Sequence, residues 1–197
     1  GWGSKPDFPI SVLICKKIAE ALSNAWEKEH ITHQNLRPGN ASILNNGEIL
    51  IHDLGISDFL INEENLISNG FDIWDFRYSS SEFLNTGINS PSNDIYSLGG
   101  ILHFLATGGH HPFEDAKSKN DTDILSPEKY GLSIPPEILT LMRRLMEPQA
   151  DKRPGWKETI SLFDKLSKIY IHAKSAPMRV AMPDDSKLTT GLHMIQG

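Results

Sequence analysis

Three short polar clusters stand out as places where neighbouring side chains could transfer a proton or coordinate a cation. They are residues 33–40 (His-Gln-Asn-Leu-Arg-Pro-Gly-Asn), 53–55 (Asp-Leu-Gly) and 94–99 (Asp-Ile-Tyr-Ser-Leu-Gly). Carboxylate, imidazole and amide groups are suited to such chemistry. A single Asp-Leu-Gly is common and is more typical of a turn after a strand than of a site. The order and spacing of the three clusters together are therefore more informative than any one of them.

The histidines suggest an alternative metal or hydrolytic site, formed by His33, His52, His110 and His111 with Asp53. His110 and His111 are adjacent in a Gly/Pro-rich loop and lack the i, i+4 spacing of ligands on one helix face. We expect this pair to be solvent-exposed and His52 to be a partly exposed strand residue. The sequence has no G-x-S-x-G, so a hydrolase nucleophile is unsupported.

The elements that must position these clusters are mainly helical. Apolar residues recur at three- and four-residue steps over residues 10–30, and this period predicts a helix. Further helices are predicted over residues 136–146 and 156–171. The stretch 94–107 is apolar nearly all round and contains Gly99-Gly100, so we expect a helix that opens with the 94–99 cluster and lies in the middle of the core, with another backbone close to its glycines.

A β-hairpin is predicted between the first two clusters. Asn45-Asn46-Gly47 separates two short apolar runs, and Asn-Gly favours the positive φ angles of a tight turn. From residue 57 to about residue 89 the chain is rich in Asn, Ser and Gly and is predicted to be a long irregular loop. The predicted fold class is mainly α with one short β-hairpin.

In this order the clusters resemble the C-terminal lobe of the protein kinase fold, from about residue 10 to residue 171. Residues 33–40 resemble the catalytic loop H-R-D-L-x-x-x-N, residues 53–55 the D-F-G motif, and residues 78–82 the A-P-E end of the activation segment. Later family markers are matched, in order, by Asp94–Gly99, Thr107-Gly108, Pro112-Phe113 and Asp151–Pro154. The resemblance implies a kinase-like C-terminal lobe over residues 1–172 and a tail over 173–197, docked on the lobe or exchanged with a neighbour.

Two departures from the family pattern concern catalysis. The aspartate that accepts or orients the proton of the attacking hydroxyl is replaced by Asn35, whose amide is a negligible base near neutral pH. The arginine before it, which often pairs with a phosphorylated activation loop, is replaced by Gln34, which cannot form a bidentate charge-assisted pair with phosphate. We expect weakened or absent phosphoryl transfer and no switching by activation-loop phosphorylation.

At three other positions of the family pattern, this chain has a side chain of the same chemical kind as the family. The resemblance implies that Asn40 and Asp53 hold magnesium, for which an amide oxygen and a carboxylate are suitable hard ligands, and that Arg37 replaces the usual lysine with its charge intact.

It also implies structural roles for five residues. His33 packs the loop, Gly55 ends the D-F-G counterpart, Glu82 and Arg153 form an ion pair, and Asp94 binds the catalytic-loop backbone.

The composition limits the class of partner. The net charge of −6 argues against a broad nucleic-acid or anionic-lipid surface, and the single cysteine, Cys15, excludes an internal disulfide and a cysteine-built zinc site. We expect a cytoplasmic protein that does not insert into a membrane. Its expected partners are another protein, the missing N-terminal lobe or a second copy in a homodimer.

Three functions are compatible with these residues. The first is a pseudokinase that acts as a binding or scaffolding module. The second is the lobe of a Ser/Thr protein kinase that keeps weak activity when joined to its N-terminal lobe. The third is a small-molecule phosphotransferase, because Pro38-Gly39-Asn40 also resembles aminoglycoside- and choline-kinase loops. The 94–99 helix, Pro112-Phe113 and Arg153-Pro154 favour the protein kinases.

The sequence predicts that these 197 residues alone do not bind Mg-ATP in the family's manner, because they contain neither G-x-G-x-x-G nor V-A-I-K. Either the chain is a fragment of a longer kinase-like protein that uses Mg-ATP, or it is a free-standing module. A thermal-shift titration of the 197-residue chain with Mg-ATP should show no saturable stabilisation. Micromolar binding would contradict this expectation.

Overall fold

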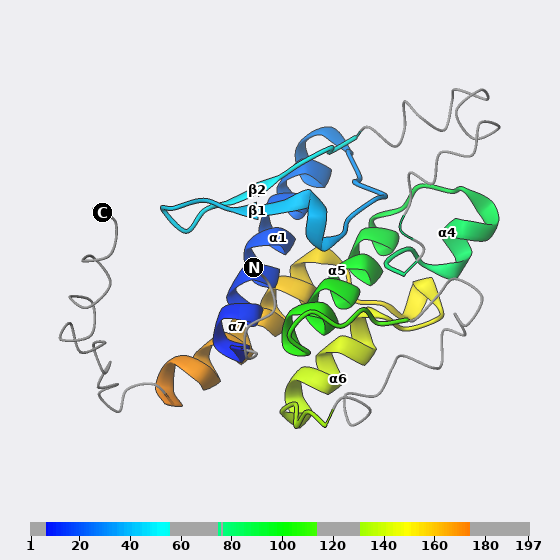
Figure 1. Cartoon of the computed structure of the whole chain (residues 1–197). Coiled ribbons are helices and arrows are strands. Elements are labelled where there is room, and N and C mark those ends of the chain that lie inside the picture. The colour runs from blue at the N-terminus through cyan, green and yellow to red at the C-terminus, as the bar shows by residue number, and fades with distance from the viewer. Residues whose placement is uncertain (1–6, 56–74, 76, 114–130, 174–197) are drawn as a thin grey trace, which may run out of the picture.

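The computed structural model describes residues 7–55, 75, 77–113 and 131–173 (Figure 1). Its elements in chain order are α1 (Phe8–Glu29), η1 (Pro38–Asn40), β1 (Ala41–Ile43), β2 (Ile49–Ile51), α4 (Ser81–Thr86), α5 (Pro91–Ala106), α6 (Pro136–Leu145), η3 (Ala150–Lys152) and α7 (Trp156–Ala173). The predicted class, mainly α with one hairpin, is confirmed for these residues. Within them, no helix is long and apolar enough to cross a membrane.

Helix α1 confirms the helix predicted over residues 10–30. The side chain of Asp7 accepts the N–H of Ile10 at 3.0 Å and so caps the first turn. The helix ends at His30, whose φ of 54° is left-handed and whose N–H donates to the carbonyl of Trp26. The buried face of α1 packs against α5 and α7.

The predicted hairpin is also confirmed. Strands β1 and β2 are antiparallel, with Ala41 opposite Ile51 and Ile43 opposite Ile49. Gly47 has a φ of 79° and donates its N–H to the Leu44 carbonyl at 2.8 Å, so this turn uses the backbone freedom of glycine. Strand β2 contacts α1, which fixes the hairpin on the helical body.

Helix α5 lies in the middle of the molecule and contacts α1, α6 and α7 (Figure 1). It begins at Pro91, so the expectation that the helix opens at Asp94 is wrong. Ser90 is the cap, since its Oγ accepts the N–H of Ser92 at 3.2 Å, and Pro91 occupies the first helical position, where it needs no donor. Asp94 therefore lies inside the first turn.

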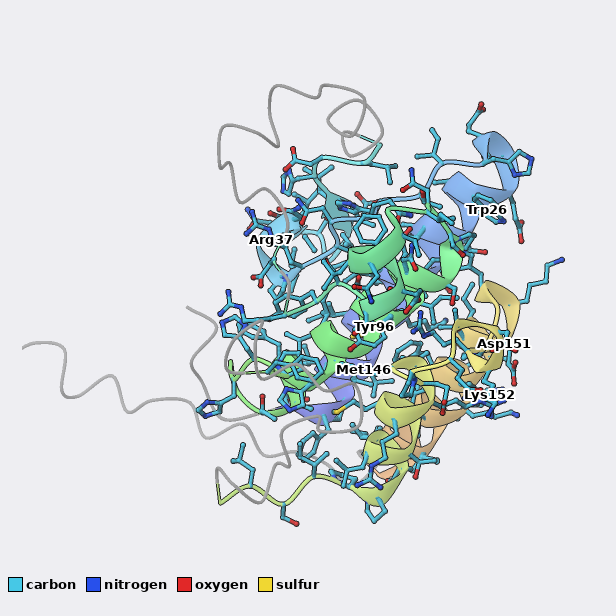
Figure 2. All side chains as sticks on the ribbon, turned by 90° about the vertical axis from the view of Figure 1, so that its right-hand side faces the viewer. Trp26, Arg37, Tyr96, Met146, Asp151 and Lys152 are labelled. Carbon is cyan, nitrogen blue, oxygen red and sulfur yellow. The ribbon has the colours of Figure 1, made fainter. Side chains whose placement is uncertain are left out.

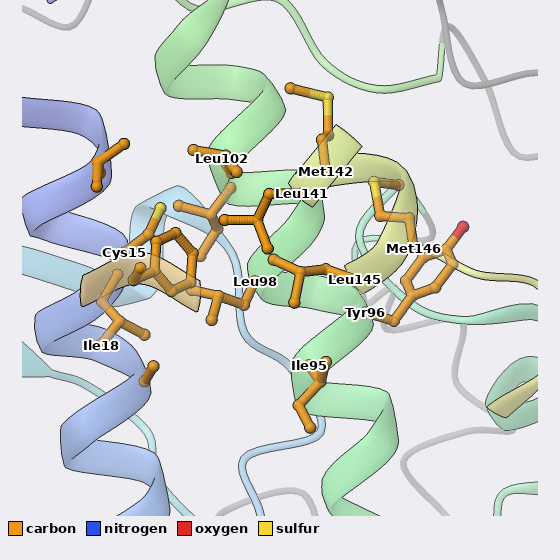
Figure 3. Close-up of a cluster of buried hydrophobic side chains, with 14 of the residues drawn as sticks. Cys15, Ile18, Ile95, Tyr96, Leu98, Leu102, Leu141, Met142, Leu145 and Met146 are labelled. Carbon is orange, nitrogen blue, oxygen red and sulfur yellow. The ribbon is translucent and has the colours of Figure 1, made fainter. Parts of the chain in front are cut away.

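The core is the contact of α1, α5, α6 and α7, and Figure 3 shows part of it. Cys15 and Ile18 of α1 face Leu98 and Leu102 of α5 there, and burial raises the pKa of the Cys15 thiol. Gly99 allows the close approach that the sequence predicted. A Cβ at this position would lie 2.5 Å from Cγ of Met146, at the end of α6.

The region expected to be irregular between residues 57 and 89 contains the short helix α4, so that prediction is wrong for residues 81–86. Gly87, at φ 64°, ends this helix with its N–H bonded to the Phe83 carbonyl. Six residues are too few to produce a clear hydrophobic period. Residues 56–74 and 76 lie outside the described part, as does the tail 174–197 with its expected docking.

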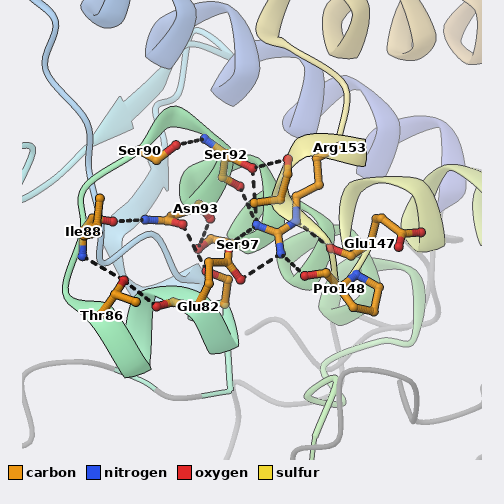
Figure 4. Close-up of polar contacts among 12 residues, drawn as sticks. Glu82, Thr86, Ile88, Ser90, Ser92, Asn93, Ser97, Glu147, Pro148 and Arg153 are labelled. Atoms are coloured by element: carbon orange, nitrogen blue, oxygen red, sulfur yellow. Dashed lines mark hydrogen bonds and ion pairs between the residues drawn. The ribbon is translucent and has the colours of Figure 1, made fainter.

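An ion pair joins α4 to the loop before α7 (Figure 4). The side chain of Arg153 is fully buried, and its guanidinium binds both carboxylate oxygens of Glu82, with Nη2 3.0 Å from Oε2. Its Nε donates to the Glu147 carbonyl at 2.7 Å and its Nη1 to the Ser92 carbonyl at 3.2 Å. The guanidinium carbon lies 4.8 Å from the centre of the Tyr96 ring, a cation–π contact. Arg153 thus connects α4, α5 and the segment that follows α6.

We predict that Gly99→Ala destabilises the chain. Its Cβ would also lie 3.0 Å from Cβ of Leu145, and overpacking of about 1–3 kcal/mol outweighs the helix propensity of alanine, about 1 kcal/mol. Denaturant unfolding measures the change. Gly155→Ala is the matched control, because nothing beyond its own chain neighbours lies within 4 Å of its added Cβ. A Gly99→Ala chain as stable as the unsubstituted one would show that α5 and α6 are not in close contact.

The Glu82–Arg153 pair predicts an acid-sensitive component of stability. Burial raises the pKa of the Glu82 carboxyl, but the hydrogen bonds and charge of Arg153 outweigh burial, so the pKa lies below its ordinary value. Because the folded pKa is the lower one, the contribution is complete near neutral pH and is lost as the pH falls through the range where Glu82 protonates.

Glu82→Gln should therefore lower the free energy of unfolding at pH 7 by about 1–3 kcal/mol and flatten its decline toward pH 3. Glu158→Gln, which breaks an exposed pair with Arg144, is the control and should cost about 0.5 kcal/mol or less. Equal losses of unfolding free energy in both variants would contradict a stabilising role of the Glu82–Arg153 pair. So would a Glu82→Gln chain whose unfolding free energy declines toward pH 3 as steeply as that of the unsubstituted chain.

Candidate functional site

The start of the 33–40 loop is bound by the carboxylate of Asp94, which projects from the first turn of α5. Asp94 is 1% exposed, and its two oxygens accept the N–H groups of His33 and Gln34, both at 2.7 Å. Gln34 has a φ of 62°, an uncommon backbone conformation for a residue with a side chain. The two charge-assisted bonds hold the loop in this conformation.

Asn35 follows immediately and is 9% exposed. Its carbonyl accepts a hydrogen bond of 2.9 Å from Nδ2 of Asn40, in η1, so the beginning and end of the loop are tied together. The loop therefore places an uncharged carboxamide at residue 35 in a fixed backbone.

The hairpin brings Asn40 and Asp53 to one end. Asn40 directly precedes β1, Asp53 follows β2 by two residues, and the N–H of His52 donates to the Asn40 carbonyl at 2.8 Å. Asp53 is exposed, with a φ of 59°, and Gly55 continues the turn at φ 77°. Since Nδ2 of Asn40 is used within the loop, its Oδ1 is the atom suited to a cation. An amide oxygen and an accessible carboxylate at one hairpin end fit magnesium.

His33 is fully buried beside this end of the hairpin. Burial lowers the pKa of its imidazole, and the negative charge of Asp53 and backbone hydrogen bonds only partly oppose that effect. The ring is thus neutral near pH 7, as suits a residue that packs the loop.

Arg37 carries the positive charge of the loop. Its side chain is half-buried, and its Nε is buried without a hydrogen-bond partner among the described residues. Figure 2 shows Arg37 on the side of the molecule opposite Trp26, Asp151 and Lys152. The loop, the hairpin end and Arg37 form the candidate site on that side.

The metal or hydrolytic alternative finds no support in the geometry. His111 is partly buried rather than solvent-exposed as expected, because its Nδ1 is 2.7 Å from the Tyr78 hydroxyl and its ring packs on Phe104. His110 is exposed, as predicted. Within residues 7–55, 75, 77–113 and 131–170, no three His, Cys, Asp or Glu side chains are placed to share a metal ion.

Two features were not foreseen from the sequence. Asn93 links the loop to residues before α4 by neutral hydrogen bonds, although an Asn in the first turn of a helix carries no distinctive signal. A groove of about 620 Å³ lies on the other side, between Trp26, Pro91, Arg153 and Trp156. Its lining includes two tryptophans, Trp26 of α1 and Trp156 of α7.

Comparison with known proteins agrees with this geometry. Residues 10–162 match the protein kinase domain family. Mitogen-activated protein kinase kinase 1 of Arabidopsis thaliana is 34% identical over 106 residues, which are 54% of this chain and 29% of that protein. Dual specificity protein kinase FUZ7 of Mycosarcoma maydis is 30% identical over 183 residues, 82% of this chain and 40% of that protein.

A probable serine/threonine-protein kinase, irlA, of Dictyostelium discoideum is 30% identical over 128 residues, 64% of this chain and 9% of that protein. The chain thus spans less than half the length of each of these relatives. The family match nevertheless covers most of the chain and includes the loop, the hairpin and α5. The chain belongs to the protein kinase family.

Proposed function

We propose that this chain is the C-terminal lobe of a pseudokinase, with residues 1–172 as the lobe, and that it binds or scaffolds other proteins. The observation that carries the proposal is Asn35. It occupies the family's proton-accepting position in a loop held by Asp94 and Asn40, yet its amide cannot accept a proton near neutral pH. The loop keeps its backbone arrangement and lacks the base.

Gln34 supports the same conclusion. Its buried side chain donates from Nε2 to the Ser90 carbonyl at 3.3 Å and accepts at Oε1 from Asn93 at 3.0 Å. The family's arginine at this place carries a charge for a phosphorylated segment. Here the corresponding side chain is used in neutral bonds to α5 and the residue before it, which suits a chain that is not switched by phosphate.

Exposed apolar side chains support a role in binding. Ile43, Leu44 and Leu50 on the hairpin and Ile10 and Leu13 on α1 are each more than two-fifths exposed. Apolar surface of this kind favours coverage by another polypeptide. We propose the remaining part of a longer protein, a protein partner or a second copy of this chain as the covering group.

The second candidate is a Ser/Thr protein kinase of low activity, favoured by the retained Asn40, Asp53 and Arg37. Asn40 and Asp53 would hold magnesium, which neutralises nucleotide phosphate charge when bound. Arg37 would supply a fixed positive charge to the same phosphates. Asn35 would orient a substrate hydroxyl by hydrogen bonding without taking its proton.

A phosphoryl-transfer assay on the longest natural chain that contains this sequence separates the two candidates. The pseudokinase proposal predicts label transfer at background, and transfer in Asn35→Asp that rises by up to about 10²–10⁴-fold if the remaining groups are competent. Asn24→Asp, the same change on the exposed face of α1, is the control and should stay at background.

Low magnesium-dependent transfer that Asp53→Asn abolishes would favour the second candidate. An unsubstituted chain with ordinary kinase turnover, unaffected by Asn35→Asp, would overturn the pseudokinase proposal.

A further inference from the structure

A buried group of uncharged side chains connects the catalytic loop, α5 and the residues that lead into α4. At its centre is Asn93, whose Nδ2 donates to the Ile88 carbonyl at 2.9 Å (Figure 4). The same Nδ2 donates to Oε1 of Gln34 at 3.0 Å. Its Oδ1 accepts from the hydroxyl of Ser80 at 3.1 Å. Each part of the Asn93 amide is thus used, as stability requires of a buried polar group.

Two backbone carbonyls fix the orientation of both amides. The Ile88 carbonyl can only accept, so Nδ2 of Asn93 must face it. The Ser90 carbonyl likewise requires Nε2 of Gln34, which directs Oε1 of Gln34 toward Asn93. Turning either amide over would bring two acceptors together in a buried place, at the cost of an unsatisfied group. The arrangement is therefore specific to one pairing.

Charged groups near this cluster are already engaged. Asp94 accepts the N–H groups of His33 and Gln34, and Glu82 is paired with Arg153. Ser80 is fully buried, so its hydroxyl is not accessible to a modifying enzyme in this conformation. The three side chains that join the loop to the residues before α4 need neither an added anion nor a bound cation.

We propose that Asn93 is a positioning residue that holds the catalytic loop and the entry to α4 in one arrangement without phosphorylation. This rests on the proposed function, since it concerns the regulation of the same loop. The loop and the start of α4 are then ordered in the unmodified chain, so a protein partner that contacts α4 or the more exposed part of the loop, residues 37–39, meets it preformed.

The direct test compares backbone hydrogen exchange of the longest natural chain before and after treatment with a protein phosphatase. Exchange in peptides covering residues 33–40 and 80–88 should agree within about twofold, because no phosphate contributes to their protection. Exchange that rises about tenfold or more after dephosphorylation would overturn the proposal.

Variants test Asn93 itself. Asn93→Ala leaves the Gln34 and Ile88 oxygens and the Ser80 hydroxyl without this partner, and should speed exchange in both segments about tenfold or more while α7 stays protected. Asn24→Ala, on the exposed face of α1, is the control. If Asn93→Ala does not fold, Ser80→Ala removes one bond of the cluster and should speed exchange before α4.

A rescue experiment distinguishes a positioning role of Asn93 from general destabilisation of the fold. Gln34→Arg alone places an unpaired charge against the Asn93 amide and should loosen the loop. Adding Asn93→Asp supplies a carboxylate partner and should restore at least part of the protection. No restoration in the double variant, or unchanged exchange in Asn93→Ala, would contradict the role of Asn93.

These readouts do not depend on phosphoryl transfer. A chain that transfers phosphate at ordinary turnover but keeps its protection after dephosphorylation would refute the proposed function and retain the positioning role. An inactive chain that loses protection after dephosphorylation would refute the positioning role alone.

Discussion

The carboxylate of Asp94 accepts the N–H groups of two consecutive loop residues from a position that is 1% exposed. A buried carboxylate is costly unless hydrogen bonds replace its lost hydration, and two bonds of 2.7 Å provide that replacement. The same bonds hold Gln34 at its positive φ. The loop conformation therefore depends on α5 standing where it does, and α5 is held there by its contacts with α1, α6 and α7.

The backbone conformation of the 33–40 loop does not depend on the chemical group that residue 35 carries. Asp94, Asn40 and the hairpin register determine where residues 33–40 and Asp53 lie, and none of these contacts requires a charge at residue 35. An uncharged Asn35 is therefore compatible with this arrangement, and under the proposed function it replaces the family's proton acceptor. Gln34 and Asn93 extend the same pattern, because neutral amides connect the loop to α5. These neutral contacts support the proposed pseudokinase function.

Much of the framework could be predicted because its signals are local and repeated. The helix over residues 10–30 has several turns of apolar period, Asn46-Gly47 marks the hairpin, and Gly99 marks a close approach. Helix α4 has six residues and no period, so the sequence predicts a loop there. The apolar stretch that predicts α5 begins only after Asp94, whereas the helix itself begins three residues earlier at the Ser90-Pro91 cap.

The site was only partly predictable for a related reason. The family resemblance located Asn35, Asn40, Asp53 and Asp94 by motif. The role of Asn93 depends on partners 59 residues earlier and 13 residues earlier in the chain, and no periodicity connects such positions. His111 was expected in solvent because its neighbours are glycine and proline, whereas contact with Tyr78 partly buries it. Long-range polar contacts become visible only once the chain is folded.

Amide exchange at His33 and Gln34, followed by NMR, is the most direct measurement of the central claim that one buried carboxylate holds this loop. In the unsubstituted chain both amides should exchange only by global unfolding, at rates close to those of the α5 core, and in Asp94→Asn both should exchange through local opening. Rapid exchange of these two amides in the unsubstituted chain, with α5 still protected, would contradict the account.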